Sequence, residues 1–190
     1  MVAYGGACSK APPLHPALAD VVFQGQAAGP ALDQLLAATL LMDPTRAAVI
    51  DAPANGTLLH TSTVATFRWH LAGAMASSRP GSPALLPASS GAQRQPARWL
   101  WDLLGPERAA HAGESGVGYY LQFSTDAKPR LLRVFTTATS YTPDAKAWKT
   151  LSAAMVWTKL SIFTATFQDD TLAPGGGPFE GTPILFCIDK

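Results

Sequence analysis

Hydrophobic and polar side chains alternate over residues 119–124, where Tyr119, Leu121 and Phe123 recur at every second position. Successive side chains of a β-strand point to opposite faces, so this pattern predicts a strand with one strongly apolar face. After a short turn, residues 131–137 return to β-branched and aromatic side chains. The two segments predict a β-hairpin whose apolar face must pack against another element.

A helix is expected directly after this hairpin. Thr142 supplies an N-cap hydroxyl, and Pro143 fits the first helical position. Trp148, Leu151 and Met155 follow at intervals of three and four residues, which places them on one stripe of a helix. Packing of that stripe on the hairpin would give a β-β-α unit with its own small core.

The C-terminal part of the chain predicts two further strands separated by a long loop. Residues 160–167 are apolar on both faces of a strand, with Leu160 on one face and Phe163 on the other. Burial on both sides is typical of a strand in the middle of a sheet. A Gly-rich loop is expected over residues 169–183, and residues 184–188 predict the last strand.

Two helices are predicted near the start of the chain. Residues 30–42 begin with a proline and carry leucines on one broad stripe, as an amphipathic helix does. Residues 16–24 form a shorter apolar segment around Val21 and Val22, where we expect a short helix. Residues 1–14 contain prolines and no periodic pattern, which predicts an extended arm.

A second hairpin and a third helix are predicted next. Residues 47–51 and 57–60 flank Asn55-Gly56, a dipeptide typical of a two-residue hairpin turn. Residues 62–78 begin with capping hydroxyls, and their apolar side chains recur at the three- and four-residue spacing of a helix. The apolar positions of this expected helix are Val64, Phe67, Leu71 and Met75.

Segments rich in Pro, Ser and Gly separate the two halves. Residues 77–96 predict a long insert, and such loops are uncommon in compact domains unless they are functional or disordered. Residues 97–104 are apolar nearly all round and predict a short helix. The chain therefore predicts a single α+β domain over residues 15–190. Its antiparallel sheet, built from two hairpins plus C-terminal strands, would pack against three or four helices.

The predicted order of helix, hairpin, helix, hairpin and helix between Pro30 and Lys159 is similar to that of roadblock and longin-like domains. Those domains act as dimerising scaffolds, so the resemblance implies a regulatory dimerisation module. The similarity is one of element order, and the long insert departs from the compact spacing of that family.

Charged residues make up 14% of the chain, below the roughly 25% of an average soluble protein. A weakly charged surface suits burial against other subunits, although a GC-rich coding genome gives a similar composition. The net charge of +1 argues against nucleic-acid binding. No apolar run is long enough to span a bilayer, and the N-terminus lacks the features of a secretory signal. We therefore expect a non-secreted, intracellular protein, or one assembled within a particle, with Cys8 and Cys187 reduced.

Ser115 is the candidate nucleophile of an alternative hypothesis. It lies in Gly-Glu-Ser-Gly, which resembles the Gly-Asp-Ser-Gly of chymotrypsin-like proteases, and the order His60 or His70, Asp102, Ser115 matches that family. This pattern would suit a small serine hydrolase. A turn that leads into the following strand would explain the same glycines without any catalytic role. The histidines lack metal-ligand spacing, so we expect no metal and no cofactor.

The preferred hypothesis is a non-catalytic structural or assembly subunit of a larger complex, such as a virion or another multi-subunit machine. Tryptophan is favoured at binding hot spots, and arginine stems can cover a short apolar helix. Burial of the tryptophans in the core, and contact of the arginines with single-stranded nucleic acid, remain alternatives. The candidate interface residues are Arg94, Arg98, Trp99, Trp101 and Leu103.

Overall fold

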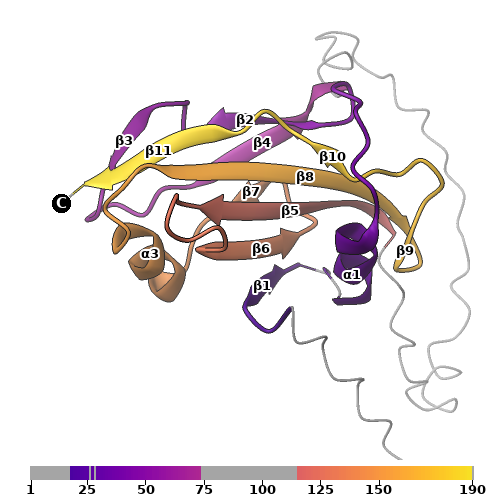
Figure 1. Ribbon diagram of the computed structural model, residues 1–190, viewed down its shortest axis with the longest axis horizontal. Coiled ribbons are helices and arrows are strands. Elements are labelled where there is room, and N and C mark those ends of the chain that lie inside the picture. The colour runs from indigo at the N-terminus through magenta and orange to yellow at the C-terminus, as the bar shows by residue number, and fades with distance from the viewer. Residues whose placement is uncertain (1–17, 26, 28, 74–114, 190) are drawn as a thin grey trace, which may run out of the picture.

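The computed structural model describes residues 18–25, 27, 29–73 and 115–189. These residues form a mostly-β fold with two helices, an eight-stranded mixed sheet and a three-stranded antiparallel sheet (Figure 1). The strands of the large sheet are β1 (Val21–Gln24), β3 (Thr57–His60), β5 (Gly116–Ser124), β6 (Leu132–Thr136), β8 (Thr158–Gln168), β9 (Thr171–Leu172), β10 (Phe179–Glu180) and β11 (Ile184–Asp189). The small sheet contains β2 (Ala48–Ala52), β4 (Phe67–Leu71) and β7 (Ser140–Tyr141), and the helices are α1 (Gly29–Ala37) and α3 (Ala145–Ser152).

The main path of the large sheet runs β1-β6-β5-β8-β11-β3, with β9 and β10 pairing with β8 outside that path. The predicted hairpin is confirmed, because β5 and β6 pair antiparallel with Phe123 opposite Leu132. The central position predicted for residues 160–167 is confirmed too, since β8 pairs with β5 on one side and β11 on the other.

The predicted helix after the hairpin is confirmed as α3, but it begins two residues later than its sequence suggests. Asp144, rather than Thr142, is the N-cap, and its carboxylate accepts a hydrogen bond of 2.7 Å from the Ala147 N–H. Trp148 is buried, whereas Met155 lies beyond the helix in a left-handed conformation with φ 48°. The apolar stripe therefore ends one turn earlier than predicted.

The short helix predicted over residues 16–24 is wrong, because residues 21–24 form β1, which runs parallel to β6. The side chains of β1 alternate between two cores: Val22 packs into one, while Val21 and Phe23 pack into the other. Two-sided packing against a distant strand overrides the weak helical pattern of this segment.

The hairpin predicted through Asn55-Gly56 is also wrong. β2 pairs with β4, and β3 instead runs parallel to β11 at the edge of the large sheet. The Asn55 side-chain carbonyl accepts a hydrogen bond of 2.8 Å from the Leu185 N–H. This turn therefore directs the chain to the C-terminal strand, in the other sheet, rather than back to β2.

The helix predicted from residue 62 is wrong where the structure describes it, because residues 67–71 form β4. Phe67 and Trp69 are buried on one face, while Arg68 is exposed on the other. A spacing of four residues, as between Phe67 and Leu71, fits both a helical turn and two strand repeats.

The fold class therefore needs correction. The large sheet is mixed rather than antiparallel, since β1 and β3 each have a parallel neighbour. The described residues contain two helices rather than three or four. The predicted arm (1–14), insert (77–96) and helix (97–104) lie outside the described residues.

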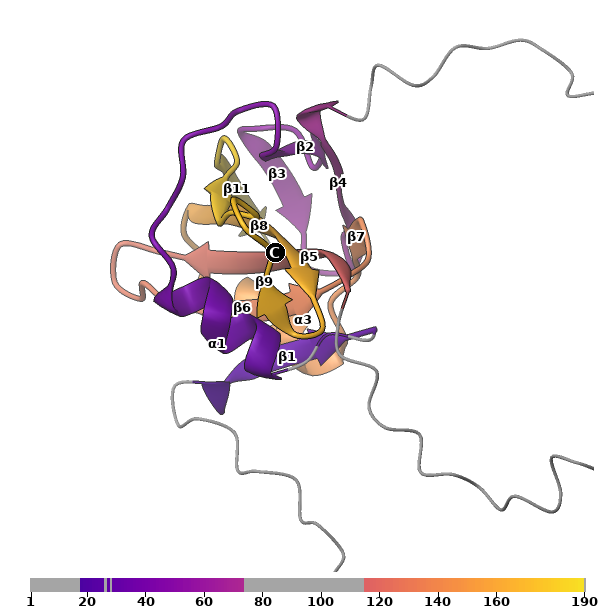
Figure 2. The same ribbon diagram turned by 90° about the vertical axis from the view of Figure 1, so that its right-hand side faces the viewer.

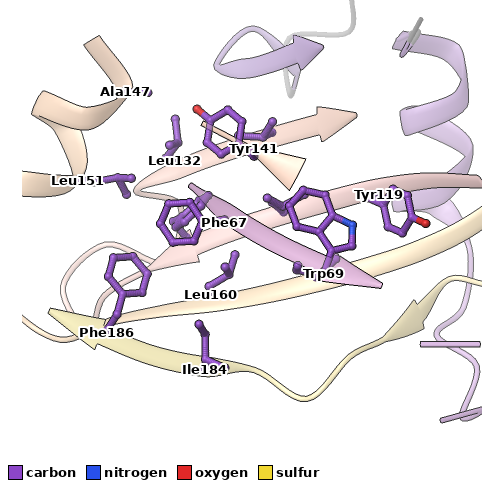
Figure 3. Close-up of a cluster of buried hydrophobic side chains, with 14 of the residues drawn as sticks. Phe67, Trp69, Tyr119, Leu132, Tyr141, Ala147, Leu151, Leu160, Ile184 and Phe186 are labelled. Atoms are coloured by element: carbon purple, nitrogen blue, oxygen red, sulfur yellow. The ribbon is translucent and has the colours of Figure 1, made fainter. Parts of the chain in front are cut away.

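The inner core lies between the two sheets and is rich in aromatic side chains (Figure 3). Phe67 packs against Phe123 and Phe186 with ring centroids 5.1 and 5.3 Å apart. The buried Trp69 indole nitrogen has no hydrogen-bond partner among the described residues, and the indole ring packs edge-to-face against the Tyr119 ring, with centroids 5.6 Å apart and ring planes at 65°. Edge-to-face packing of this kind is a favourable arrangement of two aromatic rings in a core.

The outer core lies on the opposite face of the large sheet, beneath α1. Its buried side chains include Leu32 and Leu35 of α1, Tyr120 of β5, Phe135 of β6 and Phe167 of β8. Figure 2 shows α1 and β4 on opposite sides of β5 and β8. The helix predicted over residues 30–42 is thus confirmed as the cover of this face, although it ends at Ala37.

Candidate interaction surface

Most of the exposed large hydrophobic side chains in the described residues gather in two groups. The first, which we call the edge surface, consists of Leu58, Trp157 and Leu185, with exposed fractions of 66%, 50% and 46%. Monomeric proteins rarely leave such side chains clustered, and clusters of this kind mark interaction sites. The second group, the α1 surface, consists of Leu36, Leu40, Leu41 and Met42.

Strand register assembles the edge surface. Leu58 of β3 is opposite Cys187 of β11, and Leu185 follows on the same face of β11, two residues away. Trp157 directly precedes Thr158, whose partner on β11 is Phe186. Thr158 and Phe186 are buried on the inner face of the sheet. Because successive side chains of a strand point to opposite faces, Trp157 lies on the outer face, which also carries Leu58 and Leu185.

The edge surface adjoins an unpaired strand edge. β3 is the last strand on the main path of the large sheet, and among the described strands it pairs with β11 alone. Its sequence, Thr-Leu-Leu-His, contains no Lys, Asp, Glu or Pro. Natural proteins usually protect edge strands with charges, proline or a bulge, so an uncharged edge beside exposed leucines is a template for pairing with another chain.

The α1 surface lies toward the other end of the molecule, where Figure 1 shows α1 far from β3. A cavity of about 190 Å³ opens beside it, lined in part by Leu36, Leu40, Tyr120 and Phe163. Burial raises the pKa of Tyr120 to about 12, which keeps its phenol neutral. The hollow is therefore an uncharged, mainly apolar depression.

A polar pair occupies the solvent face of the small sheet. His70 Nδ1 lies 2.8 Å from Asp51 Oδ1 across β2 and β4. Such a carboxylate orients an imidazole for proton transfer. In the described part of the chain, however, no hydroxyl or thiol forms a hydrogen bond with His70, so the pair lacks the nucleophile that acyl transfer needs.

Ser115 has a local partner in the structure. The Asp169 N–H donates a hydrogen bond of 3.0 Å to Ser115 Oγ, and this contact joins the start of β5 to the end of β8. The two described histidines are engaged elsewhere, His60 with Ser62 and His70 with Asp51. The Ser115 hydroxyl in turn donates a long hydrogen bond of 3.4 Å to Asp169 Oδ1, so its partner in the described residues is this neighbouring carboxylate and neither of the two described histidines, while Asp102 lies outside them.

A second cavity, of about 210 Å³, is lined by Arg46, Val117, Thr164 and Phe179 among others. The Arg46 guanidinium donates a 2.6 Å hydrogen bond to the Gly175 carbonyl and lies 4.5 Å from the centre of the Phe179 ring. Both contacts hold the Arg46 side chain in place, and the hydrogen bond ties it to the Gly-rich loop at Gly175. Within the described ranges, no three His, Cys, Asp or Glu side chains cluster as a metal site, and no helix is long and apolar enough to cross a membrane.

The interface residues predicted from sequence, Arg94, Arg98, Trp99, Trp101 and Leu103, all lie outside the described residues. Cys187, expected to be reduced, is a free, half-buried thiol beside Leu58, and Cys8 is outside the described residues. Sequence reasoning missed Leu58, Trp157 and Leu185. Leu58 and Leu59 are adjacent in a four-residue strand, and this pair was a usable signal. A strand directs two successive side chains to opposite faces, so one of the two leucines must lie on the outer face.

No protein-family model, curated protein or solved structure matches this chain. Its function must therefore be argued from the edge surface, the α1 surface and the polar groups described above.

Proposed function

We propose that this protein is a non-catalytic assembly subunit that joins other protein subunits through its exposed apolar surfaces. The observation that carries the proposal is the placement of the edge surface and the α1 surface near two ends of one molecule. A subunit with two separate contact surfaces can hold two neighbours at once.

The chemistry of both surfaces supports protein contact. Trp157 is half exposed, and tryptophan is among the residues most often found at binding hot spots. The low fraction of charged residues, 14%, reduces the cost of removing such surfaces from water. A regulatory dimerisation scaffold would use the same edge, but the observed strands replace the element order on which the resemblance to roadblock and longin-like domains rested.

The proposal is tested on the full chain in its native setting. Native size-exclusion chromatography with mass detection should place the protein in a complex well above its own 19.9 kDa. Replacing Trp157 and Leu36 with lysine, one on each surface, should release the chain from that complex, whereas Val49→Lys on the small sheet should not. A native protein that elutes at its monomer mass would overturn the proposal.

A further inference from the structure

We infer that the partner at the edge surface is a second copy of this chain, paired with it through antiparallel β3 strands across a two-fold axis. This inference rests on the proposed function and names the neighbour at one of the two surfaces. It follows from three features of β3: the side of the strand that is unpaired, its side chains and its lack of charge.

The backbone of β3 defines the kind of occupant. Its pairing with β11 uses the hydrogen-bonding groups on one side of the strand, and no described strand lies on the other side. Turn hydrogen bonds engage the Thr57 N–H and the His60 carbonyl at the two ends of the strand, and the backbone groups between them are satisfied most fully by another extended chain. The occupant is therefore a strand rather than a helix or a small molecule.

The side chains of β3 favour a strand like itself. In antiparallel pairing across a two-fold axis normal to the sheet, residues on one face of a strand are opposite residues on the same face of its partner. With the two-fold axis at Leu58, this side chain, which is 66% exposed, would lie directly opposite Leu58 of the second copy. The paired strands would then join two edge surfaces into one apolar face that includes both copies of Leu185.

Charge and strand length separate β3 from the other ends of the two described sheets, since β7 has only two residues. β2 carries Asp51 and an irregular register between Ile50 and Ala52, features that protect an edge. β1 is preceded by Asp20, which pairs with Arg133. β3 contains no Asp, Glu, Lys or Arg, so self-pairing brings no fixed like charges of the strand together. The net charge of +1 adds little long-range repulsion between copies.

The α1 surface takes no part in this pairing, because α1 lies toward the end of the molecule remote from β3 (Figure 1). Substitutions on the α1 surface therefore provide a matched control. Met42, exposed by 92%, and Leu58 are both apolar and solvent-accessible in the monomer, so replacing either with lysine removes no buried contact of the described fold.

The test is light scattering with analytical ultracentrifugation on the purified full chain over a range of concentrations. We expect a reversible dimer whose dissociation constant rises roughly ten-fold or more in Leu58→Lys, since the variant places two cations at the pairing edge. Met42→Lys and Val49→Lys should leave the constant unchanged. A chain that remains monomeric, or a dimer weakened by Met42→Lys but not by Leu58→Lys, overturns the inference.

Cross-linking identifies the contact directly. With Cys8 and Cys187 replaced by serine, Leu58→Cys should form a disulfide-linked dimer under mild oxidation, and Val49→Cys should not. If the native protein is found in a larger complex but the purified chain neither dimerises nor cross-links through position 58, the self-pairing inference fails and the assembly proposal survives. If the native protein is also monomeric, both fail.

Discussion

The two ends of one sheet face differ in what covers them. Toward β9, the outer face of β8 presents Ala165 and Phe167, which are buried beneath α1. Toward β3, the same face presents Lys159, Leu185 and Leu58 to solvent. The alternation of side chains continues along the sheet, so the difference arises from the covering element and not from the strands. One end buries its outer face within the chain, and the other leaves apolar side chains for a contact outside it.

The exposed end is nevertheless well packed on its inner side. Leu160 and Phe186 are fully buried there, and the Trp148 indole of α3 donates a hydrogen bond of 2.9 Å to the Thr61 carbonyl. The contrast between the two ends is therefore confined to the outer face. Substitutions on that face therefore test the contrast most directly.

The largest expected effect is at the covered end. Phe167→Ala should lower the free energy of unfolding by about 3–5 kcal/mol, because it removes a fully buried ring and leaves a cavity beneath α1. Phe167 is 2% exposed and packs edge-on against Phe135. Urea denaturation of the variant and the parent measures the difference. A loss below about 1 kcal/mol would mean that α1 does not seal this face.

The next largest effect is expected at alkaline pH, which should lower the free energy of unfolding through a tyrosine at the covered end. Burial raises the pKa of Tyr120 to about 12, above its ordinary value of 10. Because the folded pKa is higher than the unfolded one, stability is fully present below pH 10 and is lost as pH rises through the folded pKa. The loss for Tyr120 should be roughly 2–3 kcal/mol between pH 10 and 12.

Tyr141 of the inner core shows the same behaviour, since burial and the nearby Asp144 charge raise its pKa to about 12. Urea denaturation at pH 8 and at pH 11 in the parent, Tyr120→Phe and Tyr141→Phe separates the two contributions. Each substitution should reduce the loss of unfolding free energy between pH 8 and pH 11. Equal loss in all three proteins would place the alkaline sensitivity elsewhere.

These contrasts also explain how far the sequence could be interpreted. The β5–β6 hairpin and α3 were predictable because their partners are near in sequence and their patterns are local. β1 was predicted as a helix, and β3 was correctly predicted as a strand but with the wrong partner, because their partners, β6 and β11, lie far along the chain. A short apolar segment does not specify a distant neighbour, and tertiary pairing decided its structure.

The edge surface was harder to predict than the core. Leu185 follows the buried Ile184 and precedes the buried Phe186, so alternation alone places it on the outer face of β11. Whether that face is covered depends on where α1 packs, and α1 lies over the end of the sheet that carries Ala165, Phe167 and β9 rather than over β11. Exposure at the edge surface is thus a property of the assembled layers and not of any local pattern.

A smaller effect is expected from the helix that supports the inner side of the exposed end. Asp144→Ala removes the N-cap hydrogen bond to the Ala147 N–H and should lower the free energy of unfolding by about 1 kcal/mol. Asp144→Asn, which keeps a side-chain acceptor, is the matched control and should retain most of the stability. Thermal denaturation measures both variants. Equal losses would show that the carboxylate charge, rather than the cap geometry, stabilises α3.

The smallest effect on the monomer is expected at the exposed end itself. Leu185→Ser should change the free energy of unfolding by less than about 0.5 kcal/mol at protein concentrations too low for association, because the side chain is 46% exposed. At higher concentration the parent should gain apparent stability, since a partner that binds only the folded state stabilises it by mass action. The variant should gain less, and the gap between the two proteins should widen with concentration. A large loss at low concentration would instead mean that Leu185 is already buried within its own chain, which would make the two ends of the sheet alike.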